Sequence, residues 1–542
     1  MRLNSLWIDR FKNLRNFGVD FQSCSPYMVL VGENGSGKSN LLEAITLIFR
    51  NADLNLRAAF GYRIAYTCRG NELEVSARNG SWPICWIRTE GQGTRRRLSR
   101  KEFMADDDDG KPLYRPAFVF GYYSGPSDRL AHLYDRHRDR YYNSIIRSSE
   151  QRTRAKGRDP NTLRRLFYAQ TLHGQFALLA FFMEPDGGPE GDQGFLREKL
   201  QIEALDSVLF VLKQPGWRRK GDDGRFWNAE GEVREFLGRL YAEAMCPLRM
   251  ERRVAGELAR SSSVECLYLF LPGANALERV YEEYSNQYGF FTALESMHLS
   301  EVLAEVRTRV RMSPSGGGGE VTYRDLSEGE QQLLLVLGLL KFTARDEALF
   351  LLDEPDTHLN PLWSAQYLGF LDRFIADRES CHVFMTTHDP LVLSRLRKEE
   401  VRILRRGEDG NVEAEAPMLD PRGMGVGGIL TSDLFGLRTT LDEDTQSQVE
   451  RQRELALKPE LEAEEESELR QLTDALTRLG FSTAGRDPLY QRFLRKWTQR
   501  ASVDAGTVRR LSAAELREEE ALVAEIAEEL AAEIAAERDH QQ

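Results

Sequence analysis

Residues 27–48, YMVLVGENGSGKSNLLEAITLI, decide the fold of this chain. The apolar run before Gly32 predicts a short buried strand, and the spacing of apolar residues after Ser39 predicts an amphipathic helix. Between them, Gly32 to Ser39 fit the pattern G-x-x-x-x-G-K-[ST] in the strand, turn and helix context that it requires. A glycine-rich turn before a helix could be purely structural, but that would leave the pair of Lys38 and Ser39 unexplained.

This turn predicts a phosphate-binding loop. Its glycines allow several backbone N–H groups to face one centre, and the dipole of the following helix adds positive potential there. Lys38 would reach the β- and γ-phosphates of ATP, and the Ser39 hydroxyl would be a ligand of Mg²⁺. The residues expected to bind nucleotide here are Asn34, Gly35, Ser36, Gly37, Lys38, Ser39 and Asn40.

A second stretch, ALFLLDEP at 348–355, supplies acidic groups at the end of an apolar strand. Asp353 would hold Mg²⁺, because this hard cation takes oxygen ligands, and Glu354 would orient and polarise the attacking water. After one helix the strand HVFMTT ends at His388, where a contact with the γ-phosphate would be needed. A histidine at a strand end is more often structural. The alternation of strands and helices over 348–406 predicts a parallel sheet.

These motifs together resemble the ABC-type ATPase head, in its SMC, RecF and RecN branch. The resemblance covers residues 1 to about 125 and 262 to about 410. It implies an α/β fold with two lobes, a parallel P-loop sheet and an antiparallel β lobe. It also implies that LSEGEQQ at 326–332 is the signature motif, which would act on nucleotide held by a second copy of the chain. Its nucleotide-binding residues would be Ser327, Gly329 and Glu330, with Asp356 in the D-loop and His388 as the switch histidine.

Two features depart from that family. The glutamine of the Q-loop cannot be identified, because FVFGYYSGPSD at 118–128 occupies its place without one, and Gln92 is only a fallback. Lys38 and Ser327 are 289 positions apart, yet the chain between them has no sustained heptads of a coiled coil. We therefore expect a compact head.

The pattern divides the chain into four regions. Residues 1–125 are expected to form the first lobe, 126–261 a helical and partly basic insertion, and 262–415 the second lobe. Residues 416–542 are expected to be an acidic helical extension for oligomerisation or partner binding. Within the second lobe, SPSGGGG at 313–319 separates two strand-like segments and predicts a hairpin connection.

Charge is distributed unevenly along the 542 residues. The net charge is −12, but residues 441–542 hold 24 acidic and 14 basic residues, so the rest is nearly neutral. Residues 126–165 contain eleven Arg or Lys against five Asp or Glu. The basic segment 136–165, with interleaved tyrosines, suits contact with DNA or retron nucleic acid, and it suits a solvated helical surface at least as well.

The composition also bears on location. Six cysteines fall singly along the chain, and no apolar run approaches the length of a membrane span. We expect a cytoplasmic protein without a membrane partner. A last helix at about 513–538 is predicted by the capping box Ser512-x-x-Glu515 and by an apolar stripe.

No nuclease constellation is evident. LDEDT at 441–445 contains D-x-D, but it lies in polar sequence without strands, which favours a solvated helix start. The stretches GYYSGPSD at 121–128, LFLLDEPDTHLNP at 349–361 and GGILTSDLFGLRTT at 427–440 resemble the PtuA family of ATPases from Septu and retron anti-phage systems. That resemblance implies a homo-oligomer that regulates a separate, PtuB-like HNH nuclease. The alternatives are a RecF-like repair ATPase that binds DNA itself and an OLD-like ATPase with its own nuclease activity.

Overall fold

The fold is described from a computed structural model of the chain. The structure describes all residues except 22–24, 90–94, 109, 126, 128, 147–164, 185–187, 189–190, 218–223, 256–260, 344–346, 376–378, 408–409, 459–460, 480–495, 497–499, 501–516, 518–519 and 531–542. The chain forms two compact units, Met1–Ala416 and Pro417–Gln542. No helix in the described part of the chain is long and apolar enough to cross a membrane.

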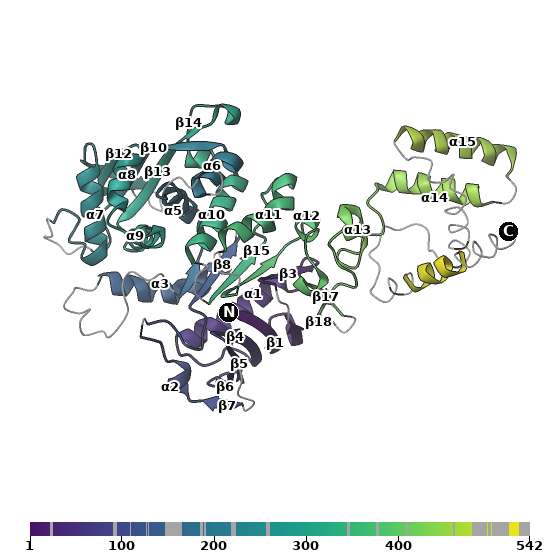
Figure 1. The fold of residues 1–542 in the computed structure, drawn as a ribbon, viewed down its shortest axis with the longest axis horizontal. Coiled ribbons are helices and arrows are strands. Elements are labelled where there is room, and N and C mark those ends of the chain that lie inside the picture. Colours follow the sequence, from purple (N-terminus) through teal and green to yellow (C-terminus); the bar gives the residue numbers. More distant parts are fainter. Residues whose placement is uncertain are drawn as a thin grey trace. The chain divides into compact units, whose positions relative to one another are not determined.

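A seven-stranded sheet lies at the centre of the first unit (Figure 1). All its strands are parallel except Val412–Glu415, the last one along the chain, which pairs antiparallel with its neighbour at one edge of the sheet. Their order is β18 (Val412–Glu415), β17 (Val401–Arg406), β3 (Tyr27–Gly32), β16 (Cys381–Thr386), β15 (Ala348–Asp353), β8 (Phe118–Tyr123) and β9 (Leu166–Tyr168). Every residue of β3, β15 and β16 is buried, as expected for strands covered on both faces. The predicted parallel P-loop sheet is thus confirmed.

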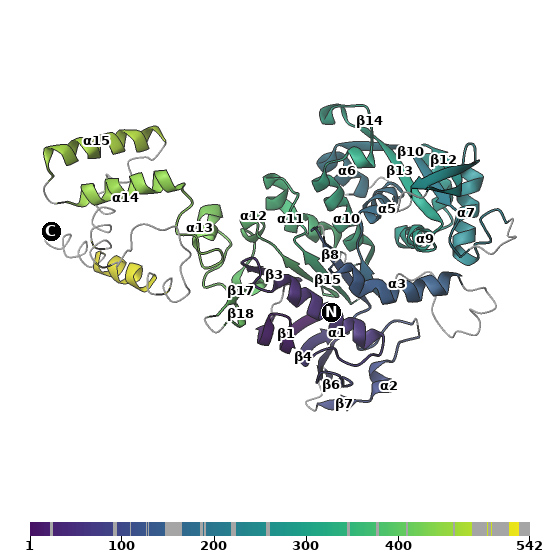
Figure 2. The same ribbon diagram turned by 180° about the vertical axis from the view of Figure 1, so that it is seen from behind.

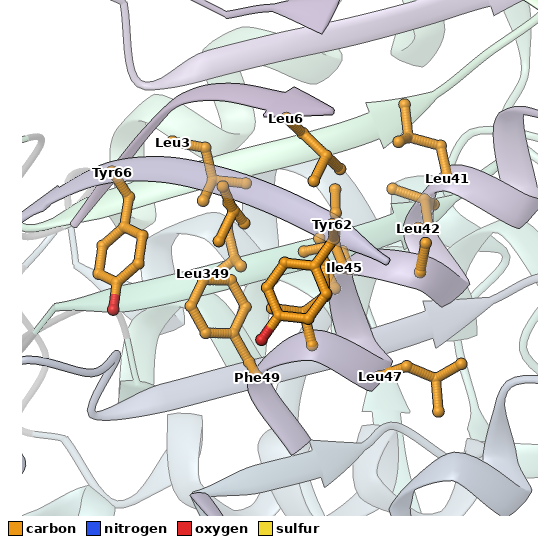
Figure 3. Close-up of a cluster of buried hydrophobic side chains, with 14 of the residues drawn as sticks. Leu3, Leu6, Leu41, Leu42, Ile45, Leu47, Phe49, Tyr62, Tyr66 and Leu349 are labelled. Carbon is orange, nitrogen blue, oxygen red and sulfur yellow. The ribbon is translucent and has the colours of Figure 1, made fainter. Parts of the chain in front are cut away.

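An antiparallel sheet of six strands forms the β lobe of the first unit. Its order is β2 (Leu14–Asp20), β1 (Arg2–Phe11), β4 (Tyr62–Cys68), β5 (Asn71–Ala77), β6 (Ile84–Thr89) and β7 (Arg96–Leu98), followed by the short helix α2 (Arg100–Phe103). Figure 3 shows that side chains of β1 and β4 meet those of helix α1 (Lys38–Asp53). Leu3 and Tyr62 belong to the strands, and Leu42 and Phe49 to the helix. This packing fixes the helix that follows the glycine-rich turn.

A third sheet is formed by residues that lie, along the chain, after strand β9 and before strand β15 of the central sheet. Its order is β11 (Leu248–Ala255), β12 (Ser261–Pro272), β10 (Ile202–Lys213), β13 (Leu303–Met312) and β14 (Glu320–Thr322). The helices of this region are α3 (Ala131–Ile146), α5 (Thr171–Phe182), α6 (Asp192–Leu200), α7 (Gly231–Glu243), α8 (Ala274–Tyr281) and α9 (Gln287–Leu299). The predicted hairpin at 313–319 is confirmed, because β13 and β14 pair antiparallel on either side of it.

The expectation that 126–261 would be helical needs correction. This range contains β9, β10 and β11, and β12 begins at its end. In β10 the pairing with β13 shifts register between Ile202 and Ala204 and again between Leu205 and Ser207. Such irregularities interrupt the alternation of inward and outward residues, so the usual sequence signal of a strand is lost. The sheet also extends across the expected boundary at residue 261.

Helix α10 (Glu328–Thr343) joins this region to the central sheet. It packs against α5 so closely that a Cβ atom on Gly338 would lie 2.2 Å from Cβ of Ala177. Next along the chain come the helices α11 (Pro361–Phe374) and α12 (Pro390–Leu393). Asn360 caps α11 by accepting from the N–H of Trp363, and Pro361 begins it.

The second unit is helical in its described residues. It contains α13 (Gly425–Thr431), α14 (Glu443–Leu457) and α15 (Ala463–Arg478), and residues 520–530 are also helical. LDEDT forms a helix start, as predicted, because the Asp442 carboxylate caps α14 by accepting from the N–H of Thr445. Ile526 and Leu530 of the last helix are buried. The predicted capping box at Ser512 lies outside the described residues.

Candidate nucleotide-binding site

The loop from Gly32 to Lys38 depends on glycine at two points. Gly32 has φ of 150°, and a Cβ atom there would lie 2.3 Å from the backbone oxygen of Leu404. Gly37 has φ of 105°, and its Cβ atom would lie 3.0 Å from Leu14. Both positions therefore need glycine, for backbone conformation and for space.

Lys38 reaches back across the loop. Its Nζ donates to the backbone oxygens of Gly32 and Glu33, at 2.8 and 3.2 Å. Burial lowers the pKa of Lys38, while the nearby carboxylates of Glu354 and Asp353 act to raise it. The ammonium group thus lies between the loop and the acidic strand end, where it would meet an anion bound by the loop.

The other predicted residues of this loop have different surroundings. Asn34 and Gly35 are exposed, and Ser39 is half-buried at the start of α1. Ser36 is buried, and its Oγ has no hydrogen-bond partner among the described residues. Asn40 donates to Oδ1 of Asn13 at 2.6 Å and accepts from Arg129 at 2.5 Å, so its side chain supports the loop from outside.

Asp353 ends β15 with its side chain 1% exposed. One carboxylate oxygen, Oδ1, accepts from Oγ1 of Thr386 at 2.6 Å. The other oxygen, Oδ2, is buried and has no hydrogen-bond partner within the described part of the chain. A buried carboxylate oxygen left in this way is costly unless something charged binds it, and Mg²⁺ prefers this kind of ligand. The residues present therefore fit a magnesium ion.

Glu354 lies at the turn after β15 with φ of 53°, a left-handed conformation. Its N–H donates to Oγ1 of Thr386 at 3.0 Å, which helps to hold this turn. Its Oε1 is 3.5 Å from Nε2 of His388. Burial and the charge of Asp353 raise the pKa of Glu354, although Lys38 opposes this. A carboxylate with a raised pKa is a better proton acceptor.

His388 follows β16 and is 38% exposed. Burial and the nearby charge of Lys38 lower its pKa, while Asp353 acts in the opposite direction. The imidazole is therefore favoured in its neutral form at pH 7, with one nitrogen free to donate and the other to accept. The structure brings Lys38, Asp353, Glu354 and His388 to the same edge of the sheet.

Asp356, which the resemblance places in the D-loop, follows the turn after β15. Its side chain is buried, and the Thr387 hydroxyl donates to it. Burial raises the pKa of Asp356 to about 7, against the hydrogen bond from Thr387. In a single copy of the chain this carboxyl group ties the D-loop to the end of β16.

The signature segment begins with a capping box at the start of α10. Oε2 of Glu330 accepts from the N–H and from the hydroxyl of Ser327, at 2.7 and 2.8 Å. Ser327 is exposed, whereas Gly329 is buried. A Cβ atom on Gly329 would lie 2.5 Å from the backbone oxygen of His358. In one copy, Glu330 thus holds Ser327, and Gly329 lets the helix approach the loop after Glu354.

Three residues at this edge were given no role of their own in the sequence prediction, although the first of them ends the LSEGEQQ motif. Gln332 of α10 is buried, and its Oε1 accepts from the N–H of His358 at 3.2 Å. Ser124 follows β8, where the Q-loop was expected, and its Oγ is 3.2 Å from Oγ1 of Thr357. The Thr357 hydroxyl in turn donates to the backbone oxygen of Glu354 at 2.9 Å. The fallback, Gln92, lies outside the described residues.

The basic segment 136–165 is only partly described. Residues 136–146 lie on α3, residues 147–164 are not described, and Arg165 precedes β9. Arg165 is buried and donates to Asp53 at 2.8 Å and to Asp106 at 2.8 Å. This one arginine therefore has a structural role inside the head.

Two known families match parts of this chain that contain residues of this site. Residues 1–107 match the family described as AAA ATPase domain. Residues 133–394 match the family described as AAA domain, putative AbiEii toxin, Type IV TA system. The loop with Lys38 falls in the first match, and the residues from Ser327 to His388 fall in the second.

Curated relatives agree with the resemblance drawn from the sequence. The chain is 28% identical over 195 residues to the Septu protein PtuA of Bacillus mycoides (strain KBAB4), which is 34% of this chain and 27% of that relative. It is 37% identical over 76 residues to the DNA replication and repair protein RecF of Rickettsia bellii (strain OSU 85-389), which is 14% of this chain and 19% of that relative. The chain thus spans well under half the length of either relative.

Two solved structures are distantly similar. The SMC head domain from Thermotoga maritima has a TM-score of 0.31 and 14% identity, covering 77% of this chain and 99% of that one. UvrA2 from Deinococcus radiodurans has a TM-score of 0.27 and 12% identity, covering 80% of this chain and 58% of that one.

Proposed function

We propose that this chain binds and hydrolyses ATP with Mg²⁺, and that two copies form each complete site. The observation that carries the proposal is the buried Oδ2 of Asp353, which has no hydrogen-bond partner among the described residues and lies beside Glu354 and near Lys38. A carboxylate in this position needs a cation, and a base beside a cation suits hydrolysis of the phosphoanhydride bond between the β- and γ-phosphates of ATP.

Each residue would have a separate role. The backbone N–H groups of 34–39 and the Lys38 ammonium hold the phosphates, and Ser39 and Asp353 hold the metal. When bound, Mg²⁺ neutralises charge on the phosphate oxygens. Glu354 accepts a proton from the attacking water, because its pKa is raised and its Oε1 faces the His388 side chain.

The second copy would supply the remaining contacts. Ser327 is exposed at the N-terminus of α10, where a hydroxyl, N–H groups and the helix dipole favour an anion. Glu330 now holds this hydroxyl, so it would keep Ser327 oriented rather than touch the nucleotide itself. Asp356 would contact the nucleotide only after its hydrogen bond with the Thr387 hydroxyl is broken.

The substitution Glu354→Gln tests this proposal. It removes the proton acceptor and keeps the shape, so we expect phosphate release to fall by about 10²-fold or more while ATP stays bound. Light scattering should then detect a dimer that persists in ATP and Mg²⁺. The matched control is Glu72→Gln, at a side chain 62% exposed on β5, which should hydrolyse ATP normally. Unchanged turnover in Glu354→Gln would contradict the role of Glu354 as proton acceptor.

We further propose that this ATPase regulates a separate HNH nuclease in anti-phage defence. The support is the similarity to the Septu protein PtuA. Co-expression with the product of the neighbouring gene tests it: a stable complex with an HNH protein is expected, and cleavage of plasmid DNA only when both are present.

The relatives named RecF favour one alternative, a repair ATPase that binds DNA itself. That alternative requires salt-sensitive DNA binding that ATP strengthens without a partner. An OLD-like activity, with the nuclease in this chain, would instead require that the purified chain cleave plasmid in Mg²⁺ or Mn²⁺.

A further inference from the structure

The sheet β11-β12-β10-β13-β14 buries one face, whereas the other face carries exposed side chains around the buried Val211 and Cys266. The buried face carries large apolar side chains such as Leu267, Leu269 and Phe210, each 0% exposed. Figures 1 and 2 show the helices α5 and α9 along one side of this sheet. We call the other side the open face. It is defined by Leu248, Met250 and Arg252 of β11, Tyr268 and Phe270 of β12, Leu209 of β10, and Arg307, Arg309 and Arg311 of β13.

The strand register arranges the open face in rows. Phe270 pairs with Leu209, which pairs with Arg307, so these three lie side by side across three strands. In the neighbouring row Leu248 pairs with Tyr268. Since side chains on adjacent strands are about 4.8 Å apart, an apolar half on β11 and β12 lies about 10 Å from a basic half on β13.

The apolar half is unusually accessible for a sheet. Leu248 is 52% exposed, Met250 49% and Phe270 38%. Tyr268 beside them is half-buried. Contiguous exposed apolar side chains of this kind mark interaction sites more often than bare surface.

The basic half follows from the sequence RTRVR. With a strand period of two, Arg307, Arg309 and Arg311 point to the same face, about 7 Å apart along β13. All three are exposed. Glu305 precedes them on the same face and is the one acidic side chain of β13, so the three arginines follow one another without an intervening carboxylate.

Acidic groups only partly compensate this charge. Glu305 has three arginines within 4.0 Å, namely Arg307 at 3.0 Å, Arg324 at 3.0 Å and Arg252 at 3.7 Å. Glu320 is 3.4 Å from Arg309. Four arginines therefore share these two carboxylates, and Arg311 is a fifth arginine on the same face, which leaves the open face positive in a chain whose net charge is −12.

We propose that the open face binds single-stranded nucleic acid. Two properties select this ligand over a protein or a duplex. The exposed ring of Phe270 and the half-buried ring of Tyr268 offer surfaces on which unpaired bases stack, whereas bases of a duplex are already stacked. The arginines of β13 lie beside the aromatic rings of β12 and not between them. This arrangement suits a nucleic-acid strand whose phosphates contact the arginines while its bases contact the rings.

The binding measurement uses the full chain without ATP, so that its result is independent of the proposed hydrolysis. A fluorescein-labelled oligothymidylate about 20 nucleotides long is titrated while anisotropy is recorded at several salt concentrations. We expect saturable binding that weakens with salt. Phe270→Leu keeps an apolar side chain but loses the ring, and it should weaken binding about 5- to 100-fold. Phe270→Tyr should retain most of it.

The arginines are tested together. Replacing Arg307, Arg309 and Arg311 by Gln should reduce the slope of log K against log salt by about 2, which is about 0.7 for each lost phosphate contact. The matched control replaces Arg63, Arg88 and Arg96 of the β lobe, which are 68%, 60% and 58% exposed. That control should leave affinity and slope unchanged. Circular dichroism confirms that every variant is folded.

Three results would overturn the proposal. One is the absence of binding at low salt, and another is equal binding by Phe270→Leu and the unchanged chain. The third is a preference for duplex over single strands that survives both sets of substitutions, because this would place the nucleic acid on another surface. Oligouridylate in a parallel titration separates RNA from DNA as the source of the strand.

Discussion

At the scale of single residues, Gly329 allows a sharp test of how the signature helix meets the catalytic turn. Because a Cβ atom there would lie 2.5 Å from the backbone oxygen of His358, Gly329→Ala must displace the loop after Glu354. We expect ATP affinity within about 3-fold of the unchanged chain and turnover reduced at least about 10-fold, since a small misplacement is enough. Fluorescent-nucleotide titration and phosphate release measure the two effects.

The matched control is Gly238→Ala in α7, where an added Cβ atom meets nothing within 4 Å. It should leave turnover unchanged and stabilise the helix slightly, by about 0.5–1 kcal/mol. If Gly329→Ala also retained full turnover, the contact between the signature helix and this loop would have no part in hydrolysis.

Single residues also show what the sequence could predict. Lys38, Asp353, Glu354 and His388 follow from motif spacing, and the structure brings them to one edge of the sheet. The polar start of α10 is explained in part by Ser327-x-x-Glu330, a capping box that is readable from the sequence but was overlooked in favour of a phosphate contact. Ser124 could not be found, because its place depends on the pairing of β8 with β15.

At the scale of elements, Asp53 ties the end of α1 to three other segments. Its buried carboxylate accepts from Arg115 at 2.9 Å and from Arg165 at 2.8 Å, and it is 2.9 Å from Nε2 of His137. Asp53→Asn would remove the negative charge that the buried Arg115 and Arg165 share. We therefore expect the free energy of unfolding of the first unit to fall by about 3–5 kcal/mol. Thermal and urea unfolding measure it.

The same substitution should alter the dependence of stability on pH. Although burial acts to raise it, the hydrogen bond with His137 and the charges of Arg165 and Arg115 hold the pKa of Asp53 well below its usual range. A lowered pKa stabilises the fold above about pH 4, where the unfolded carboxyl is ionised, and this contribution is lost as pH falls. The unchanged chain should therefore lose more stability than Asp53→Asn on acidification from pH 5 to 3. Equal losses would show that Asp53 is not the group responsible.

Elements differed in how readily the sequence predicted them. The strands β3, β15 and β16 are short apolar runs next to motifs, and all three were predicted. The strand β10 was missed because register shifts break its alternation, and β11 because LRMERRV carries the charges of an edge strand. Both of these strands contribute to the open face. The periodicity of the sequence therefore could not predict that apolar and basic side chains lie together on one face of a sheet.

At the scale of the whole molecule, all the residues of the candidate site belong to the first unit. The central sheet draws strands from 27–123 and from 348–415, with 166–168 at its edge, and none of its strands comes from the described residues of 417–542. The acidic excess of 441–542, with 24 acidic and 14 basic residues, therefore lies in the second unit, outside the residues that form this sheet. Its charge keeps the chain far from neutrality, which favours solubility.

This division predicts that a chain ending at Ala416 folds and binds ATP on its own. Every predicted nucleotide contact, in both copies, comes from residues 32–40 and 327–388, so we expect its ATP affinity to stay within about 3-fold of the full chain. Combined with Glu354→Gln, the truncated chain should still form the ATP-dependent dimer in light scattering. If it binds ATP but remains monomeric, then residues 417–542 supply the contact between copies. If it fails to fold by circular dichroism, the two units are not independent.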